Sequence, residues 1–67
     1  MSDVKRVIES FKAAAAASLS RGEAGFDFFI GNYNDEILGA LLLHVVREGM
    51  IIKRLRTSFL EVDFAFA

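Results

Sequence analysis

The chain has 67 residues, no cysteine, one histidine and a formal net charge of −1 at pH 7. This composition excludes a disulfide framework, a thiolate zinc site and a cysteine nucleophile, and it gives no global attraction to nucleic acid or to anionic membranes. The hydrophobic fraction is 54%, which is high for a chain short enough to bury only about 60% of its unfolded surface. Small chains of this kind usually need oligomerisation or docking to complete their core.

The first predicted element is an amphipathic helix, capped by Ser2 or Asp3 and stopped by Arg21-Gly22. Its apolar positions repeat at helical spacing and are Val4, Val7, Ile8, Phe11, Ala14, Ala15 and Leu19. Because this spacing gathers them on one face, we expect a surface helix bound along one side.

Residues 26–30 change from helical to alternating periodicity, which predicts a short strand. The alternation places Phe26, Phe28 and Ile30 on one face, and Asp27 and Phe29 on the other. We therefore expect the first set to face the core.

The best-marked helix covers residues 34–49. Asn34 is a favourable N-cap, and Gly49 stands where a left-handed residue ends a helix. Ala40 and Leu43 extend the apolar surface beyond a single stripe. Such a helix should be covered on more than one side, so we expect it to lie at the centre of the fold or against another chain.

The C-terminal stretch changes its apolar phase, because Ile51 and Leu55 are odd-numbered while Leu60 and Val62 are even-numbered. One interpretation is a hairpin with loop 56–59, which sets Arg54 across from Glu61. Its remaining predicted pairs are Leu55 with Leu60, Lys53 with Val62, and Ile51 with Phe64. The alternative is one long strand bent by a bulge near Ser58.

Taken together, residues 1–67 predict a single two-layer α+β domain in the order α-β-α-β-β. Both helices should lie on one face of a three-stranded sheet, and the strands on either side of the central helix should form a parallel crossover. The other face of the sheet should carry both apolar and charged side chains. Its apolar residues are Phe29, Ile52 and Phe59, and its charged residues are Asp27, Arg54, Arg56, Glu61 and Asp63.

No catalytic or phosphate-binding signature is present, because neither a P-loop nor a G-x-G-x-x-G sequence occurs. His44 and Glu48 are one helical turn apart, but a general base also needs a nucleophile or a substrate pocket. We interpret His44 as a partly buried or interface histidine. We expect a chain that is not an enzyme and that uses no cofactor and no metal.

Seven phenylalanines, several of them facing opposite ways on strands, predict protein binding. We expect a homo-oligomer, or an adaptor or inhibitor that docks on a larger protein. The candidate interface residues are Phe29, Leu43, Ile52, Phe59 and Phe66. The longest apolar run, residues 38–46, falls short of the roughly 20 residues needed to span a bilayer, so we expect a cytoplasmic protein without a membrane partner.

The alternative hypothesis is a dimeric nucleic-acid-binding module. Half of the basic residues lie within positions 47–56, namely Arg47, Lys53, Arg54 and Arg56. Converging cations of this kind can bind phosphates. Asp35 and Glu36 at the start of the central helix would repel them.

Overall fold

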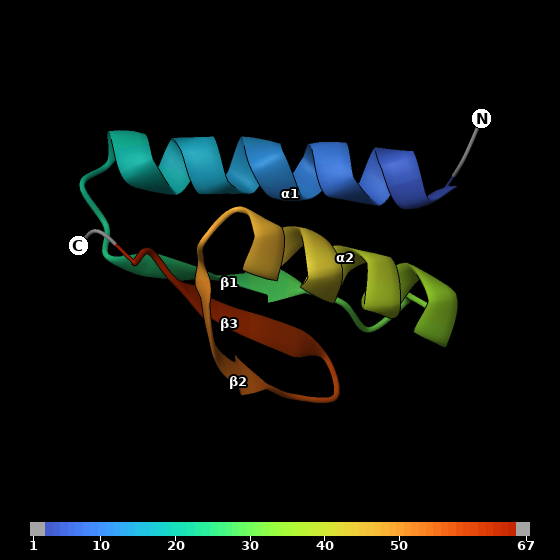
Figure 1. The fold of residues 1–67 in the computed structure, drawn as a ribbon. Coiled ribbons are helices and arrows are strands. Elements are labelled where there is room, and N and C mark those ends of the chain that lie inside the picture. Colours follow the sequence, from blue (N-terminus) through green and yellow to red (C-terminus); the bar gives the residue numbers. More distant parts are fainter. Residues whose placement is uncertain (1–2, 66–67) are drawn as a thin grey trace.

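The computed structural model describes residues 3–65, which form two helices and three strands in the predicted α-β-α-β-β order. The elements are α1 (Asp3–Ser20), β1 (Gly25–Phe29), α2 (Asp35–Arg47), β2 (Ile51–Leu55) and β3 (Phe59–Asp63). Both helices lie on the same side of the sheet (Figure 1). The α+β class and the two-layer arrangement are therefore confirmed.

The sheet has the strand order β1-β3-β2, and β3 is antiparallel to both of its neighbours. β1 and β2 consequently run in the same direction, as expected for a crossover through α2, but β3 is inserted between them. Leu60 and Val62 of β3 are 0% and 1% exposed, more buried than any residue of β1 or β2. The most deeply buried inward face of the three strands thus occupies the centre of the sheet.

Helix α1 packs through one stripe, as its periodicity predicts. Its buried residues are Val7, Phe11, Ala15 and Ser18. The Phe11 ring lies 5.2 Å from the rings of Phe26 and Phe28, measured between centroids. This cluster joins α1 to β1. Ser2, the alternative cap, lies outside the described residues.

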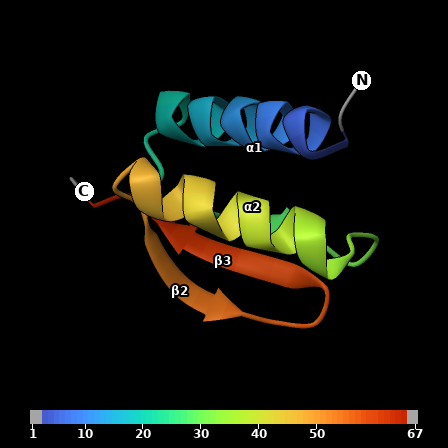
Figure 2. The ribbon, with the colours of Figure 1, turned by 45° about the vertical axis from the view of Figure 1, so that its right-hand side comes forward.

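Helix α2 has the predicted ends. The Asn34 side-chain oxygen accepts a hydrogen bond of 2.9 Å from the backbone N–H of Ile37. After the helix, Gly49 adopts φ +77°, and the N–H of Met50 donates to the carbonyl of Val45. This pattern is a Schellman motif, which needs a left-handed residue at the glycine position. Figure 2 shows α1 and α2 lying side by side above the sheet.

Replacing Asn34 by alanine should lower the free energy of unfolding by about 1 kcal/mol, because the first turn of α2 loses its side-chain acceptor. Urea denaturation followed by circular dichroism measures the change. Asn32→Ala is the matched control, since Asn32 is an exposed asparagine of the preceding turn. Equal losses in the two variants would contradict the assigned cap.

The β2–β3 hairpin is confirmed, with Leu55 opposite Leu60 and Arg54 opposite Glu61. A register shift follows, between Ile52 and Arg54. The remaining predicted pairs are wrong: Val62 lies opposite Ile52 rather than Lys53, and Ile51 lies opposite Asp63 rather than Phe64. The irregularity is in β2 and not near Ser58.

The bulge has a simple physical reason. Without it, Lys53 would face the core opposite the buried Val62. The extra residue leaves Lys53 exposed and turns Ile52 inward, where it packs against the core cluster. The prediction of Ile52 on the uncovered sheet face is therefore wrong.

The link between α1 and β1 is held by a buried hydroxyl. The Ser18 hydroxyl donates to a carboxylate oxygen of Glu23 at 2.5 Å and also lies 3.1 Å from the Gly25 carbonyl oxygen. The Arg21 guanidinium donates to the same Glu23 oxygen at 2.9 Å. The hydrogen bond from Arg21, followed by that from Ser18, lowers the pKa of Glu23 below its ordinary value of 4.5.

This lowered pKa predicts a pH-dependent stability difference. A carboxyl group with a lower pKa in the folded chain stabilises it above the unfolded-state pKa, and this contribution is lost as pH falls through the folded-state pKa. Glu23→Gln should therefore be less stable than the parent at neutral pH, and the gap should close in acid. Urea midpoints at neutral and acid pH measure it; a pH-independent gap would contradict the assignment.

Candidate protein-interaction surface

The sheet face opposite the helices is uncovered by any described element (Figures 1 and 2). Phe29 and Phe59 lie opposite each other in the β1–β3 register. Their rings meet edge to face at 5.5 Å, and the residues are 49% and 42% exposed. Their predicted positions on this face are confirmed, and the pair forms an aromatic patch beside the hairpin.

Next to the aromatic pair, the open face carries a row of charges from all three strands. Asp27 and Arg54 flank Glu61 in the register. Glu61 binds the Arg56 guanidinium, with 2.9 Å between Arg56 Nε and Glu61 Oε2. Within residues 3–65, Asp27 and Arg54 form no ion pair. One carboxylate and one cation of this row are therefore without an ion pair in the described part of the chain.

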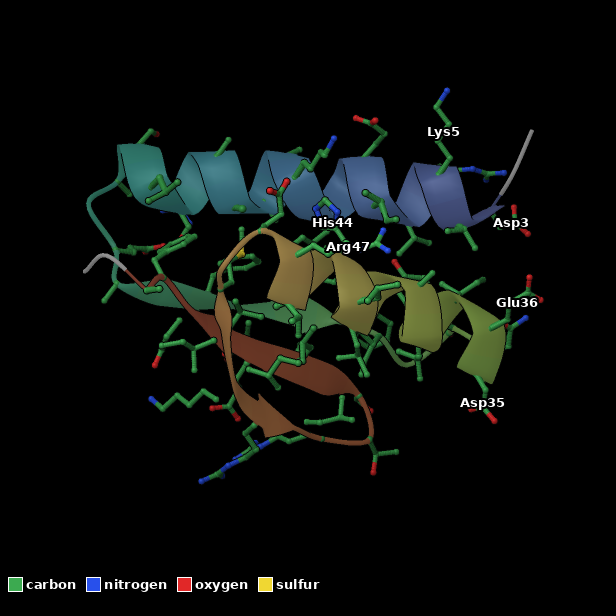
Figure 3. All side chains as sticks on the ribbon, in the orientation of Figure 1. Asp3, Lys5, Asp35, Glu36, His44 and Arg47 are labelled. Atoms are coloured by element: carbon green, nitrogen blue, oxygen red, sulfur yellow. The ribbon has the colours of Figure 1, made fainter. Side chains whose placement is uncertain are left out.

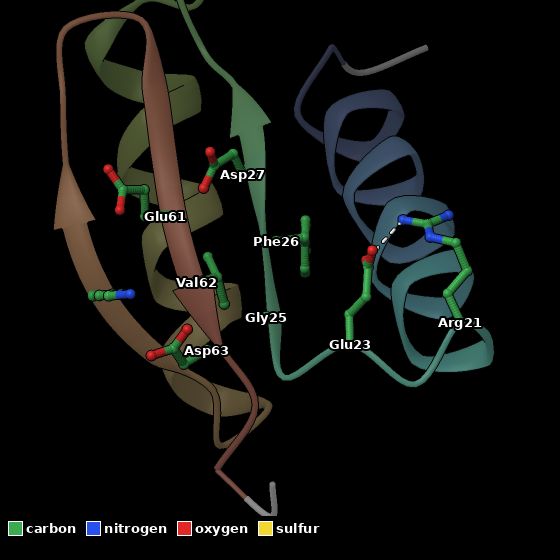
Figure 4. A pocket seen from close by; sticks show the side chains of 9 residues that line it. Arg21, Glu23, Gly25, Phe26, Asp27, Glu61, Val62 and Asp63 are labelled. Carbon is green, nitrogen blue, oxygen red and sulfur yellow. Dashed lines mark hydrogen bonds and ion pairs between the residues drawn. The ribbon is translucent and has the colours of Figure 1, made fainter.

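A charged cavity of about 480 Å³ opens at the other end of the sheet (Figure 4). Its lining residues are Arg21, Glu23, Gly25, Phe26, Asp27, Lys53, Glu61, Val62 and Asp63. Figure 4 shows the Arg21–Glu23 contact on one side and the carboxylates of Asp27, Glu61 and Asp63 on the other. In the described part of the chain, no group of three or more such side chains could hold a metal ion.

Apart from Leu19 of α1, the remaining exposed large apolar side chains lie on α2 and on β2, which is an edge strand. Ile51 and Leu55 of β2 are each 53% exposed, while Leu43 and Val46 of α2 are 50% and 60% exposed. Helix α2 contacts β2, so the four residues lie on neighbouring elements. We call Leu43, Val46, Ile51 and Leu55 the β2-edge surface.

The two β2 residues of this surface point to different sides of the sheet. Leu55 lies opposite the fully buried Leu60 and therefore faces the helix layer. Ile51 lies opposite Asp63, beyond the bulge, and faces the open side. The edge strand is thus apolar on both sides, one residue at each end.

The backbone of this edge is also free. The N–H of Arg56 donates to the carbonyl of Phe59 at 2.8 Å. In an antiparallel ladder, hydrogen-bonded and non-hydrogen-bonded pairs alternate, so the next pair, Leu55 with Leu60, is non-hydrogen-bonded. The N–H and carbonyl of Leu55 accordingly point away from β3, toward the outside of the sheet.

The four predicted basic residues do not form one free cluster. Arg56 is bound to Glu61. Arg47 lies near the last turn of α2 in the helix layer (Figure 3), whereas Arg54 lies on the open sheet face. Among residues 3–65, Arg47, Lys53 and Arg54 have no ion pair. Nucleic-acid binding stays a prediction.

His44 lies between the two helices (Figure 3), with its ring centroid 6.0 Å from that of Phe11. Its Nε2 atom is buried and has no hydrogen-bond partner among the described residues. The nearest carboxylate oxygen, Glu48 Oε1, is 3.7 Å away, which is too far for a good hydrogen bond. The interpretation of His44 as a partly buried histidine is confirmed.

The predicted interface residues do not come together on one surface. Leu43 belongs to the helix layer, Phe29 and Phe59 belong to the opposite face, and Ile52 packs against the core. Phe66 lies outside the described residues. Val46, Ile51 and Leu55 are exposed apolar residues outside the predicted set.

A signal for part of this surface was present in the sequence. Ile51 and Ile52 are consecutive in a strand, and successive strand residues point to opposite faces. One of the two must therefore leave the core whatever the register. The bulge decides that it is Ile51.

Within residues 3–65 no helix is long and apolar enough to cross a membrane. Comparisons of the chain with models of protein families, with curated proteins and with solved structures gave no match.

Proposed function

We propose that this chain is a non-enzymatic protein-interaction module and that it binds protein through the β2-edge surface. The observation that carries the proposal is the presence of four aliphatic side chains, each at least half exposed, on the edge strand β2 and on the helix α2 that contacts it. Isolated exposed apolar residues are ordinary, but a group around one edge is typical of a binding surface.

The free strand edge strengthens this argument. An exposed edge strand presents unpaired backbone groups to other chains, and proteins usually shorten it, charge it or cover it. Here β2 is short and bulged and contains Lys53 and Arg54, which protects the free chain. Ile51 and Leu55 at its ends do not contribute to solubility. They can instead stabilise a complex by becoming buried against a partner.

Photo-crosslinking tests the proposal. Benzoylphenylalanine is placed at position 55 or 46 of the full chain, in the source cell, and at the exposed α1 position 9 as the control. We expect a discrete protein adduct from positions 55 and 46 and none from position 9. The mass of the adduct shows whether the chain has bound a second copy of itself or a larger partner protein. Absence of an adduct from both edge positions, or the same adducts from position 9, would overturn it.

A further inference from the structure

We infer that β2 accepts a fourth strand, supplied by an extended acidic segment of a partner protein. The inference rests on the proposed function and adds to it the chemistry of the partner. Strand addition of this kind takes its affinity from main-chain hydrogen bonds and its specificity from alternate side chains.

The backbone of β2 has hydrogen-bonding groups that a further strand could pair with. The sheet ends at β2, and the outward N–H and carbonyl of Leu55 can pair with a strand placed about 4.8 Å farther out. Such a strand would lie beside Leu55, which faces the helix layer and is 53% exposed. Its own apolar side chains would cover this residue on the helix side.

The positive charge of β2 indicates the charge of the added strand. β2 contains Lys53 and Arg54 and no acidic residue, and neither forms an ion pair within the described part of the chain. Opposite charges directly across a strand pair are favourable, and like charges are unfavourable. A strand with carboxylates facing the open side of the sheet is therefore the complementary partner.

The inner neighbour of β2 already has this pattern. β3 places Leu60 and Val62 against the helices and Glu61 and Asp63 toward the open side, where burial is partial. Arg54 lies opposite Glu61. The inferred outer strand repeats this alternation of apolar and acidic residues on the other side of β2.

A second copy of the chain fits this edge less well. In an antiparallel β2–β2 pair about a two-fold axis, the cations at positions 53 and 54 of each copy would face those of the other, which is unfavourable. Pairing β2 with β1 of another copy brings Asp27 closer, but such a head-to-tail contact tends to continue into open assemblies. We therefore assign the edge to a different, acidic protein.

The test uses the full chain and two fluorescein-labelled nine-residue peptides, one alternating valine with glutamate and one alternating valine with lysine. Fluorescence anisotropy at low salt measures binding. The variant Lys53→Glu/Arg54→Glu reverses the charge of the edge. Lys5→Glu/Lys12→Glu makes the same change of net charge on the exposed face of α1 and is the matched control. Thermal unfolding verifies that both variants are folded, and Arg54→Gln replaces the edge variant if it is not.

We expect the glutamate peptide to bind, the lysine peptide not to bind, and the edge variant to bind the glutamate peptide about tenfold more weakly than the control variant. No binding of the glutamate peptide, equal binding of the two peptides, or equal loss in the two variants would overturn the inference. The inference would also be overturned if sedimentation showed that the chain binds only copies of itself. If adducts form from position 55 while the glutamate peptide does not bind, the acidic strand is rejected and the proposed function stands; absence of adducts rejects the proposed function itself.

Discussion

Replacing Phe11 by alanine is expected to lower the free energy of unfolding by about 3–5 kcal/mol, the largest effect of any change considered for this chain. Phe11 is fully buried, and its ring contacts those of Phe26, Phe28 and His44. A cavity at this point would separate α1 from both β1 and α2. A domain of this length has a total stability of about 3–10 kcal/mol, so the variant should be largely unfolded or close to it.

Phe59→Ala is the matched control for Phe11→Ala. The Phe59 ring contacts one aromatic ring, that of Phe29, on the uncovered face and is 42% exposed. We expect a loss of about 1 kcal/mol, from the ring pair and partial burial. Urea denaturation of the two variants measures the difference. Equal losses would show that the core described around Phe11 is wrong.

Replacing Gly25 by alanine is expected to destabilise the fold by about 2–3 kcal/mol. A Cβ atom at this position would collide with the Val62 carbonyl oxygen and lie 3.0 Å from the Asp63 Cα atom. Both are backbone atoms of the paired strand, because Gly25 lies opposite Asp63 in the register. They can move aside only if the first pair of the β1–β3 ladder opens.

Gly39→Ala provides a control of opposite sign. Gly39 lies inside α2, and a Cβ atom there would meet nothing within 4 Å. Alanine should stabilise the helix by about 0.5–1 kcal/mol, because glycine loses more backbone freedom on folding. Thermal unfolding should therefore rank Gly39→Ala above the parent and Gly25→Ala below it. A Gly25→Ala variant as stable as the parent would contradict the close approach of β1 and β3.

The features that sequence predicted well are those determined locally. Asn34 and Gly49 mark the ends of α2 through groups within a few residues of them, and the alternation of residues 26–30 assigns the faces of β1 without knowledge of its partner. The α-β-α-β-β order follows from such local signals, since each element has its own periodicity.

The features that were predicted wrongly, or not predicted, depend on distant residues. The bulge at Lys53 is favoured because Val62, across the hairpin, is buried and cannot accept a lysine opposite it. The insertion of β3 between β1 and β2 depends on pairings between residues far apart in the sequence. Neither the bulge nor the strand order can be predicted from a stretch of a few residues.

The sequence predicted an excess of exposed apolar residues but not all of their positions. An excess of apolar residues was expected to need a partner, and Leu43 is indeed half exposed. The location depends on the bulge, because it leaves Ile51 exposed and turns Ile52 toward the core. It also depends on strand order, because that order makes β2 an edge with the outward backbone of Leu55.

Amide hydrogen exchange at Leu55, measured by nuclear magnetic resonance with and without the valine–glutamate peptide, tests most directly whether the β2 edge binds a strand. The N–H of Asp27 is the internal control. Asp27 and Glu61 form a non-hydrogen-bonded pair, so the Asp27 N–H points away from β3 at the other free edge of the sheet, that of β1. We expect exchange at Leu55 to slow on saturation with the peptide while exchange at Asp27 is unchanged. Unchanged exchange at Leu55, or slowing at Asp27 instead, would contradict the assignment of β2 as the binding edge.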